Sequence, residues 1–98
     1  GMDALLEGRL IRRARCLYVA SGRGKRGVLP VWPHGFTYRE DADAVTVLDD
    51  EGHEFARTGE RISTGGGFIW EQGGEPLAEP LRSRVEGCRH EGVWIVSP

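Results

Sequence analysis

The apolar residues of this sequence fall in short runs separated by glycine-rich turns, and this spacing limits the fold more than any other feature. The clearest runs are residues 16–20, 28–32, 45–48 and 93–96, and valine, isoleucine and aromatic side chains are common in them. Side chains of these types favour strands. No segment keeps a sustained apolar period of 3.6 residues, which an amphipathic helix would need. We therefore predict an all-β protein.

Short strands joined by tight turns are typical of small barrels and sandwiches. We predict a small closed or partly open barrel, with an OB-like barrel favoured and an SH3-like barrel or a small sandwich as alternatives. The 98 residues fit a single domain. That domain is expected to span residues 2–98, because a glycine before Met2 is typical of a scar left by tag removal.

Local signals in the sequence predict four further structural features. Asp49-Asp50-Glu51-Gly52 has hairpin-turn chemistry and predicts that 45–48 and 53–57 pair as antiparallel strands. Pro30 cannot donate a hydrogen bond to a neighbouring strand, so its strand is expected at an edge or at a bulge. Gly65-Gly66-Gly67 is expected to form a turn or bulge. The apolar run 93–96 predicts a strand that is buried on both faces.

Several of these runs also carry a resemblance that would extend over most of the chain. They are similar to those of a group of small bacterial proteins, each a single β-rich domain with no assigned activity; the runs concerned are residues 16–19, 29–36, 65–67 and 92–96. The resemblance implies a bacterial β-barrel protein and carries over no catalytic or binding residue.

The two cysteines, Cys16 and Cys88, are predicted to be buried, reduced thiols, with a disulfide as the second interpretation. The sequence shows no secretory signal and no apolar run long enough to span a membrane, so the expected location is the cytoplasm. Cys88 and His90 lack the spacing of a zinc site, and no nucleophile motif is present. We therefore expect no metal, no cofactor, no membrane contact and no enzymatic activity.

Charge is distributed unevenly along the chain. Residues 9–26 hold seven basic residues and no acidic one, whereas residues 40–60 hold eight acidic residues and one arginine. A basic face on an OB-like barrel is typical of single-stranded nucleic-acid binding, for which the candidate contacts are Arg9, Arg12, Lys25 and Arg26. Pairing of the basic segment with the acidic hairpin is the favoured interpretation, since the net charge of the chain is −2.

Trp32, His34 and Phe36 form the second candidate site, a recognition loop rich in prolines and aromatic side chains. An exposed tryptophan in such a loop would mark a contact surface. The function that we expect is a non-enzymatic binding or protein-interaction module. Its partner would be another protein or a second copy of this chain, and nucleic acid is the alternative.

Overall fold

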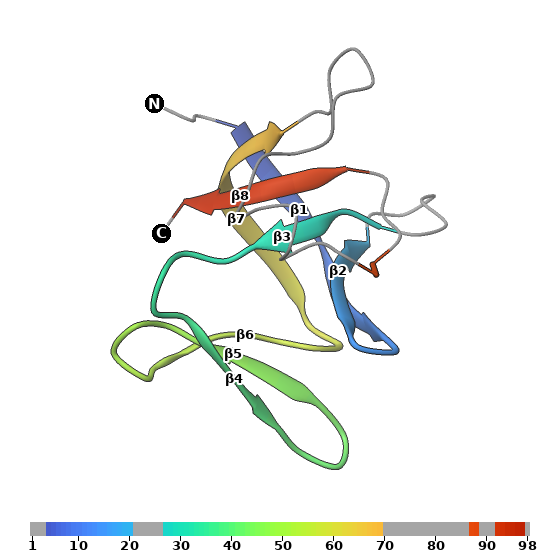
Figure 1. Cartoon of the computed structure of the whole chain (residues 1–98), viewed down its shortest axis with the longest axis vertical. Helices are drawn as coiled ribbons and strands as arrows, with labels where there is room; N and C mark the ends of the chain where they lie inside the picture. The colour runs from blue at the N-terminus through green and yellow to red at the C-terminus, as the bar shows by residue number, and fades with distance from the viewer. Residues whose placement is uncertain (1–3, 21–26, 70–86, 89–91, 98) are drawn as a thin grey trace.

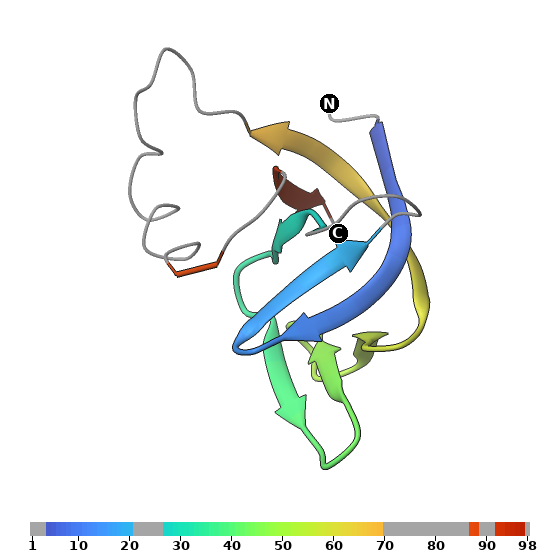
Figure 2. The ribbon, with the colours of Figure 1, turned by 90° about the vertical axis from the view of Figure 1, so that its right-hand side faces the viewer.

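The computed structural model describes residues 4–20, 27–69, 87–88 and 92–97, and no helix occurs among them. The strands in these ranges are β1 (Ala4–Arg13), β2 (Cys16–Ala20), β3 (Leu29–Val31), β4 (Thr37–Glu40), β5 (Val45–Leu48), β6 (Glu54–Arg57), β7 (Arg61–Ile69) and β8 (Val93–Ser97). They form a five-stranded sheet, in the order β2-β1-β7-β8-β3, and a three-stranded sheet, in the order β4-β5-β6. The prediction of an all-β fold is confirmed. Figures 1 and 2 show the three-stranded sheet at one end of the curled larger sheet.

The five-stranded sheet curls far enough to bring its two edge strands together. β1 pairs with β2 and β7, β7 pairs with β8, and β3 runs parallel to β8. Within the described residues, β2 meets the β3 segment at one bridge, where Val19 and Val28 exchange two backbone hydrogen bonds of 2.8 and 3.0 Å. The sheet is therefore a small, partly open barrel, as predicted. β3 lies at its edge, which is where Pro30 was expected.

Side-chain alternation sets which face of each strand is buried. Along β1, Leu6, Gly8 and Leu10 are buried and the residues between them are exposed, so the even positions face the barrel interior. They meet Val19 and Trp94 in the main core cluster. The opposite faces of β2, β3 and β8 form a second cluster around Tyr18, Leu29, Val31 and Val93. β8 is thus buried on both faces, as its unbroken apolar run predicted.

The glycine triplet forms neither a turn nor a bulge, so the sequence-based prediction is wrong. Gly65, Gly66 and Gly67 lie inside β7 and pair with β8. A Cβ on Gly66 would come within 1.9 Å of the Ile95 carbonyl oxygen and 2.8 Å of the Trp94 indole nitrogen. The indole nitrogen donates a hydrogen bond of 3.2 Å to the Gly65 carbonyl. Glycine is required at position 66 because the backbone carbonyl of Ile95, and behind it the Trp94 indole, lie where a Cβ would be, and not because the chain reverses.

The β5–β6 hairpin confirms the prediction for residues 45–57. One oxygen of the Asp49 carboxylate accepts hydrogen bonds of 2.9 Å from the backbone N–H groups of Glu51 and His53. Gly52 has a positive φ of 84°, which this turn needs and glycine supplies without strain. Val47 and Ala56 extend from this small sheet into the main core cluster. The three-stranded sheet therefore closes one end of the barrel.

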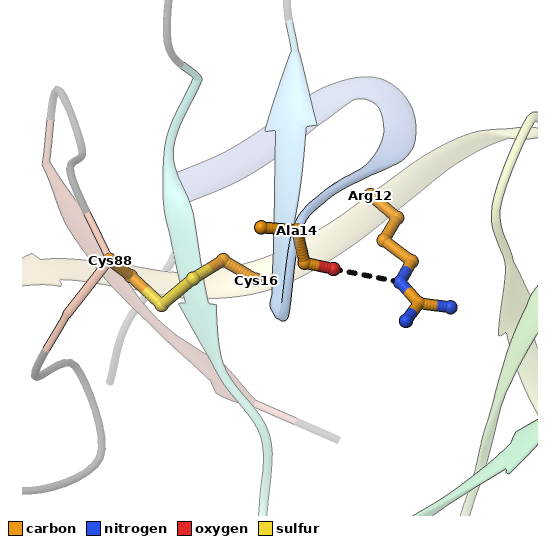
Figure 3. Close-up of a disulfide and its surroundings, with 4 residues drawn as sticks. All are labelled: Arg12, Ala14, Cys16 and Cys88. Atoms are coloured by element: carbon orange, nitrogen blue, oxygen red, sulfur yellow. Dashed lines mark hydrogen bonds between the residues drawn. A yellow bond between two sulfur atoms is a disulfide. The ribbon is translucent and has the colours of Figure 1, made fainter.

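Cys16 and Cys88 form a disulfide, so the prediction of reduced thiols is wrong. Their Cα atoms lie 5.9 Å apart, although 72 positions separate them in the sequence. Figure 3 shows the disulfide on one side of the β1–β2 turn and the Arg12 side chain on the other. In that turn the Arg12 Nε donates a hydrogen bond of 2.9 Å to the carbonyl of Ala14, which has a positive φ of 55°.

Candidate functional site

A cleft of about 520 Å³ lies where the barrel meets the three-stranded sheet. We call it the barrel–sheet cleft. Its buried and half-buried lining includes Leu17, Pro30, Trp32 and Phe36, and its exposed lining includes Arg12, Arg15, Tyr38 and Glu40. Cavities of this size, mostly apolar with a few polar groups, are the usual sites of ligand binding in proteins.

The chain segment after β3 builds the apolar part of the cleft. Beyond Val31 the chain leaves the barrel through Trp32 and Pro33, and Gly35, with a φ of 89°, turns it into β4. Trp32 and Phe36 both pack edge-to-face against Phe55 of β6, with ring centroids 5.9 and 5.2 Å apart. These contacts hold the two rings against the three-stranded sheet.

Two of the charged side chains in the cleft form an ion pair with each other, and a third has no such partner among the described residues. An Arg12 guanidinium nitrogen forms an ion pair with the Glu40 carboxylate, which links the end of β1 to the end of β4. The two side chains are 45% and 60% exposed, so water screens the pair and it contributes little to stability. Arg15 is exposed and has no ion-pair or hydrogen-bond partner in the part of the chain that is described. Within the described residues, the cleft therefore places one arginine without an ion-pair partner beside an apolar surface.

The structure separates the residues of the predicted recognition loop. Trp32 and Phe36 line the cleft, but His34 is exposed on the turn and lies outside it. Trp32 is only 7% exposed, so the expected exposed tryptophan is not found. It is buried because Phe55, from a strand distant in sequence, packs against it. The exposed aromatic side chain of the cleft is instead that of Tyr38, which is 59% exposed.

The candidate nucleic-acid contacts do not gather on one described face. Arg9 is exposed and donates a hydrogen bond to the Gly59 carbonyl, while Arg12 is paired with Glu40 at the cleft. Lys25 and Arg26 lie outside the described residues. The ion pair of Arg12 with Glu40 joins the basic segment to the acidic segment 40–60, but Glu40 lies on β4, outside the predicted acidic hairpin, so pairing with the hairpin itself stays a prediction.

Arg15, Leu17 and Tyr38 are among the cleft residues that sequence reasoning did not propose as site residues. Arg15 was seen only as one charge in a basic run, and Leu17 only as part of a strand. Tyr38 carried the clearest available signal, because it is a large aromatic residue in the otherwise polar strand Thr37–Glu40. No pattern in the sequence shows that this strand faces β2 across a cleft.

The described residues were also searched for reactive thiols, metal sites and membrane-spanning helices. Both cysteines are in the disulfide, so neither is a free thiol for nucleophilic attack or for metal binding. Among the described residues, no group of three histidine, cysteine or acidic side chains is placed to hold a metal ion. Within the same residues, no helix is long and apolar enough to cross a membrane.

Comparison with known proteins gives no indication of function, so the proposal below is argued from the geometry of the cleft. No family model, no curated protein and no solved structure matches the chain.

Proposed function

We propose that this protein is a non-enzymatic binding module whose ligand occupies the barrel–sheet cleft. The observation that carries the proposal is the cleft itself, which combines an apolar surface with the exposed ring of Tyr38 and with Arg15, which has no ion-pair partner among the described residues. An aromatic anchor and one charged group suffice to orient a ligand on an apolar surface.

We propose further that the barrel is OB-like. The support is its five strands, its partly open wall between β2 and β3, and the return of β8 to lie beside β3. OB barrels bind ligands on the face of their second and third strands and near the loop between the first and second. In this chain β2, β3 and the β1–β2 turn all contribute to the cleft.

Single-stranded nucleic acid is the second candidate ligand for this cleft. The exposed ring of Tyr38 offers a surface for base stacking and Arg15 a cation for a phosphate. We place the protein-interaction hypothesis first because Arg9 and Arg12, the two described residues among the predicted nucleic-acid contacts, already bind Gly59 and Glu40.

The disulfide also bears on location. Disulfides persist in oxidising compartments and are rare in the cytoplasm. We therefore propose that the protein works in an oxidising compartment, in place of the cytoplasm expected from the sequence. Alkylation of the protein isolated from its source, with and without prior reduction, tests this: two alkylated cysteines without reduction would refute the proposal.

A fluorescent probe tests the binding site directly. We choose 1-anilinonaphthalene-8-sulfonate, because it joins an aromatic body to a negative charge and brightens on an apolar surface. We expect one site per folded molecule, with binding about tenfold weaker in Tyr38→Ala, the usual loss for an aromatic anchor.

Leu5→Ala is the matched control for that experiment. Leu5 is 66% exposed, close to the 59% of Tyr38, and also lies on a strand, but it is outside the cleft. Far-ultraviolet circular dichroism of each variant verifies that the probe reports on folded protein. Equal loss of binding in the two variants, or none in Tyr38→Ala, would place the site elsewhere.

A further inference from the structure

Resting on the proposed function, we propose that the Cys16–Cys88 disulfide controls ligand binding at the barrel–sheet cleft: the oxidised protein binds the ligand, and reduction of the bond lowers the affinity. The proposal stands on the position of the disulfide, because both of its cysteines line the cleft. The bond is therefore part of the binding surface and not only a link that stabilises the fold. The proposal concerns the regulation of the site and holds for any ligand that contacts this wall.

The disulfide brings to the cleft a residue from a distant part of the chain. Cys88 is half-buried, and among the described residues that line the cleft it is the only one that follows Val45 in the sequence. The described part of the chain gives Cys88 no hydrogen bond, and its other contact with the barrel is apolar packing against the cluster that includes Leu29 and Val93. Reduction leaves this piece of the cleft wall without its covalent link to Cys16.

The other cysteine, Cys16, is the first residue of β2 and directly follows the β1–β2 turn. Ala14 in this turn has a positive φ of 55°, a conformation that an alanine keeps only where the surrounding structure constrains it. Arg12 spans the turn, since its Nε donates to the Ala14 carbonyl and its guanidinium pairs with Glu40 of β4 (Figure 3). Loss of the disulfide removes a constraint on the turn that links the barrel to β4.

The redox step is a thiol–disulfide exchange with a dithiol. One thiolate of the dithiol attacks a sulfur of the protein disulfide and forms a mixed disulfide, and the second thiolate then displaces the remaining cysteine. The protein gains two electrons and two protons and carries two thiols, while the dithiol becomes a cyclic disulfide. A newly made, reduced chain would then bind its ligand only after it reaches the oxidising compartment proposed above.

Ligand binding and oxidation are linked reciprocally. The factor by which oxidation raises the ligand affinity equals the factor by which bound ligand favours the disulfide over the two thiols. A tenfold factor shifts the midpoint of a two-electron redox titration by about 30 mV toward more negative potentials. A disulfide that serves stability alone changes the free energy of unfolding but leaves the ligand affinity and this midpoint unchanged. The two quantities therefore separate regulation from a structural role.

Titrations with the anilinonaphthalene probe measure the effect on affinity. The oxidised wild type is compared with the wild type in excess dithiothreitol, after alkylation and mass spectrometry have verified the redox state and far-ultraviolet circular dichroism the fold. We expect reduction to weaken binding by about tenfold, a usual size for coupling of this kind. The Cys16→Ala, Cys88→Ala double variant is the control for the reductant, and it should bind as weakly as the reduced wild type with or without dithiothreitol.

A redox titration measures the reciprocal effect without any substitution. The wild type is equilibrated over a range of ratios of reduced to oxidised dithiothreitol, and the free thiols are alkylated and counted, with and without saturating probe. We expect the probe to shift the midpoint by about 30 mV toward more negative potentials. Tyr38→Ala is the matched control, because it keeps both cysteines and should show a smaller shift at a probe concentration that saturates only the wild type.

Three results would overturn the proposal. They are equal probe affinity in the oxidised and the reduced folded protein, a midpoint that the probe does not move, and loss of the fold on reduction, since oxidation would then control folding and not the cleft. The proposed function is tested separately by Tyr38→Ala in the oxidised protein. Weaker binding there would keep the cleft as the ligand site even if the redox state has no effect, whereas unchanged binding would refute the proposed function itself.

Discussion

The disulfide makes the most quantitative prediction about stability. Its loss frees a loop closed across 72 positions, and the loop-entropy relation gives a stabilisation of about 4 kcal/mol for a closure of that length. A domain of this size has a free energy of unfolding of about 5–15 kcal/mol in total. Breaking the bond is therefore expected to remove a large share of the stability, without abolishing the fold in water.

Urea denaturation measures this effect. At a slope of about 1–2 kcal/mol per molar urea, the loss lowers the midpoint of unfolding by about 2–4 M. The wild type is compared in oxidised and reduced form, and with a Cys16→Ala, Cys88→Ala double variant. The reduced wild type retains both side chains, so it separates the effect of the bond from that of side-chain truncation. Cys16 is 8% exposed, and its truncation adds a small packing loss.

The reasoning would be refuted by oxidised and reduced wild type unfolding at the same urea concentration. Two reactive thiols in the native, unreduced protein would contradict the disulfide itself. A reduced protein that is stable while the double variant is not would show that packing of the sulfur atoms, and not the covalent bond, supplies the stability.

Three further substitutions test separate parts of the structure. The Thr46 hydroxyl is buried without a hydrogen-bond partner among the described residues, so Thr46→Val should raise the free energy of unfolding by about 1 kcal/mol, and a lower melting temperature would contradict this. Gly66→Ala forces a Cβ against a backbone carbonyl of β8 and should cost more than about 2 kcal/mol in urea denaturation. Gly65→Ala is its control, since the nearest atom there is 4.0 Å away, and equal losses would refute the close approach. Glu40→Gln should change stability by less than about 0.5 kcal/mol, because its pair with Arg12 is exposed, while it strengthens binding of the anionic fluorescent probe; unchanged or weaker binding would argue against the charge balance assigned to the cleft.

Features that depend on residues close together in the sequence could be predicted from it. Residues 16–20 and 45–48 were predicted as strands with the bounds that the structure gives them. The turn at Asp49–Gly52 was predicted from its own side-chain chemistry, since Asp49 binds the backbone that follows it. Pro30 predicted an edge strand correctly, because proline has no N–H to donate to a neighbouring strand whatever the rest of the fold is.

Features that depend on contacts between residues far apart in the sequence could not be predicted from it. The sequence of the glycine triplet is typical of a turn, and only the structure shows that the β8 backbone at Ile95 and the Trp94 indole approach it closely. Trp32 looks exposed until Phe55 is placed beside it. Nothing in the spacing of Cys16 and Cys88 indicates that β2 and the segment before β8 lie together. The cleft combines β2, β3 and β4, and strand pairing of this kind is not encoded in any single segment.

Amide chemical-shift mapping tests the central claim, that the barrel–sheet cleft is the ligand site, most directly. The isotope-labelled protein is titrated with the anilinonaphthalene probe, and the indole N–H of Trp32 is compared with that of Trp94. Trp32 lines the cleft, whereas Trp94 is fully buried and donates to Gly65. We predict shifts centred on Leu17, Trp32 and Tyr38, with little change at Trp94. Shifts centred instead on the exposed side chains of Leu5 and Phe68 would contradict the account.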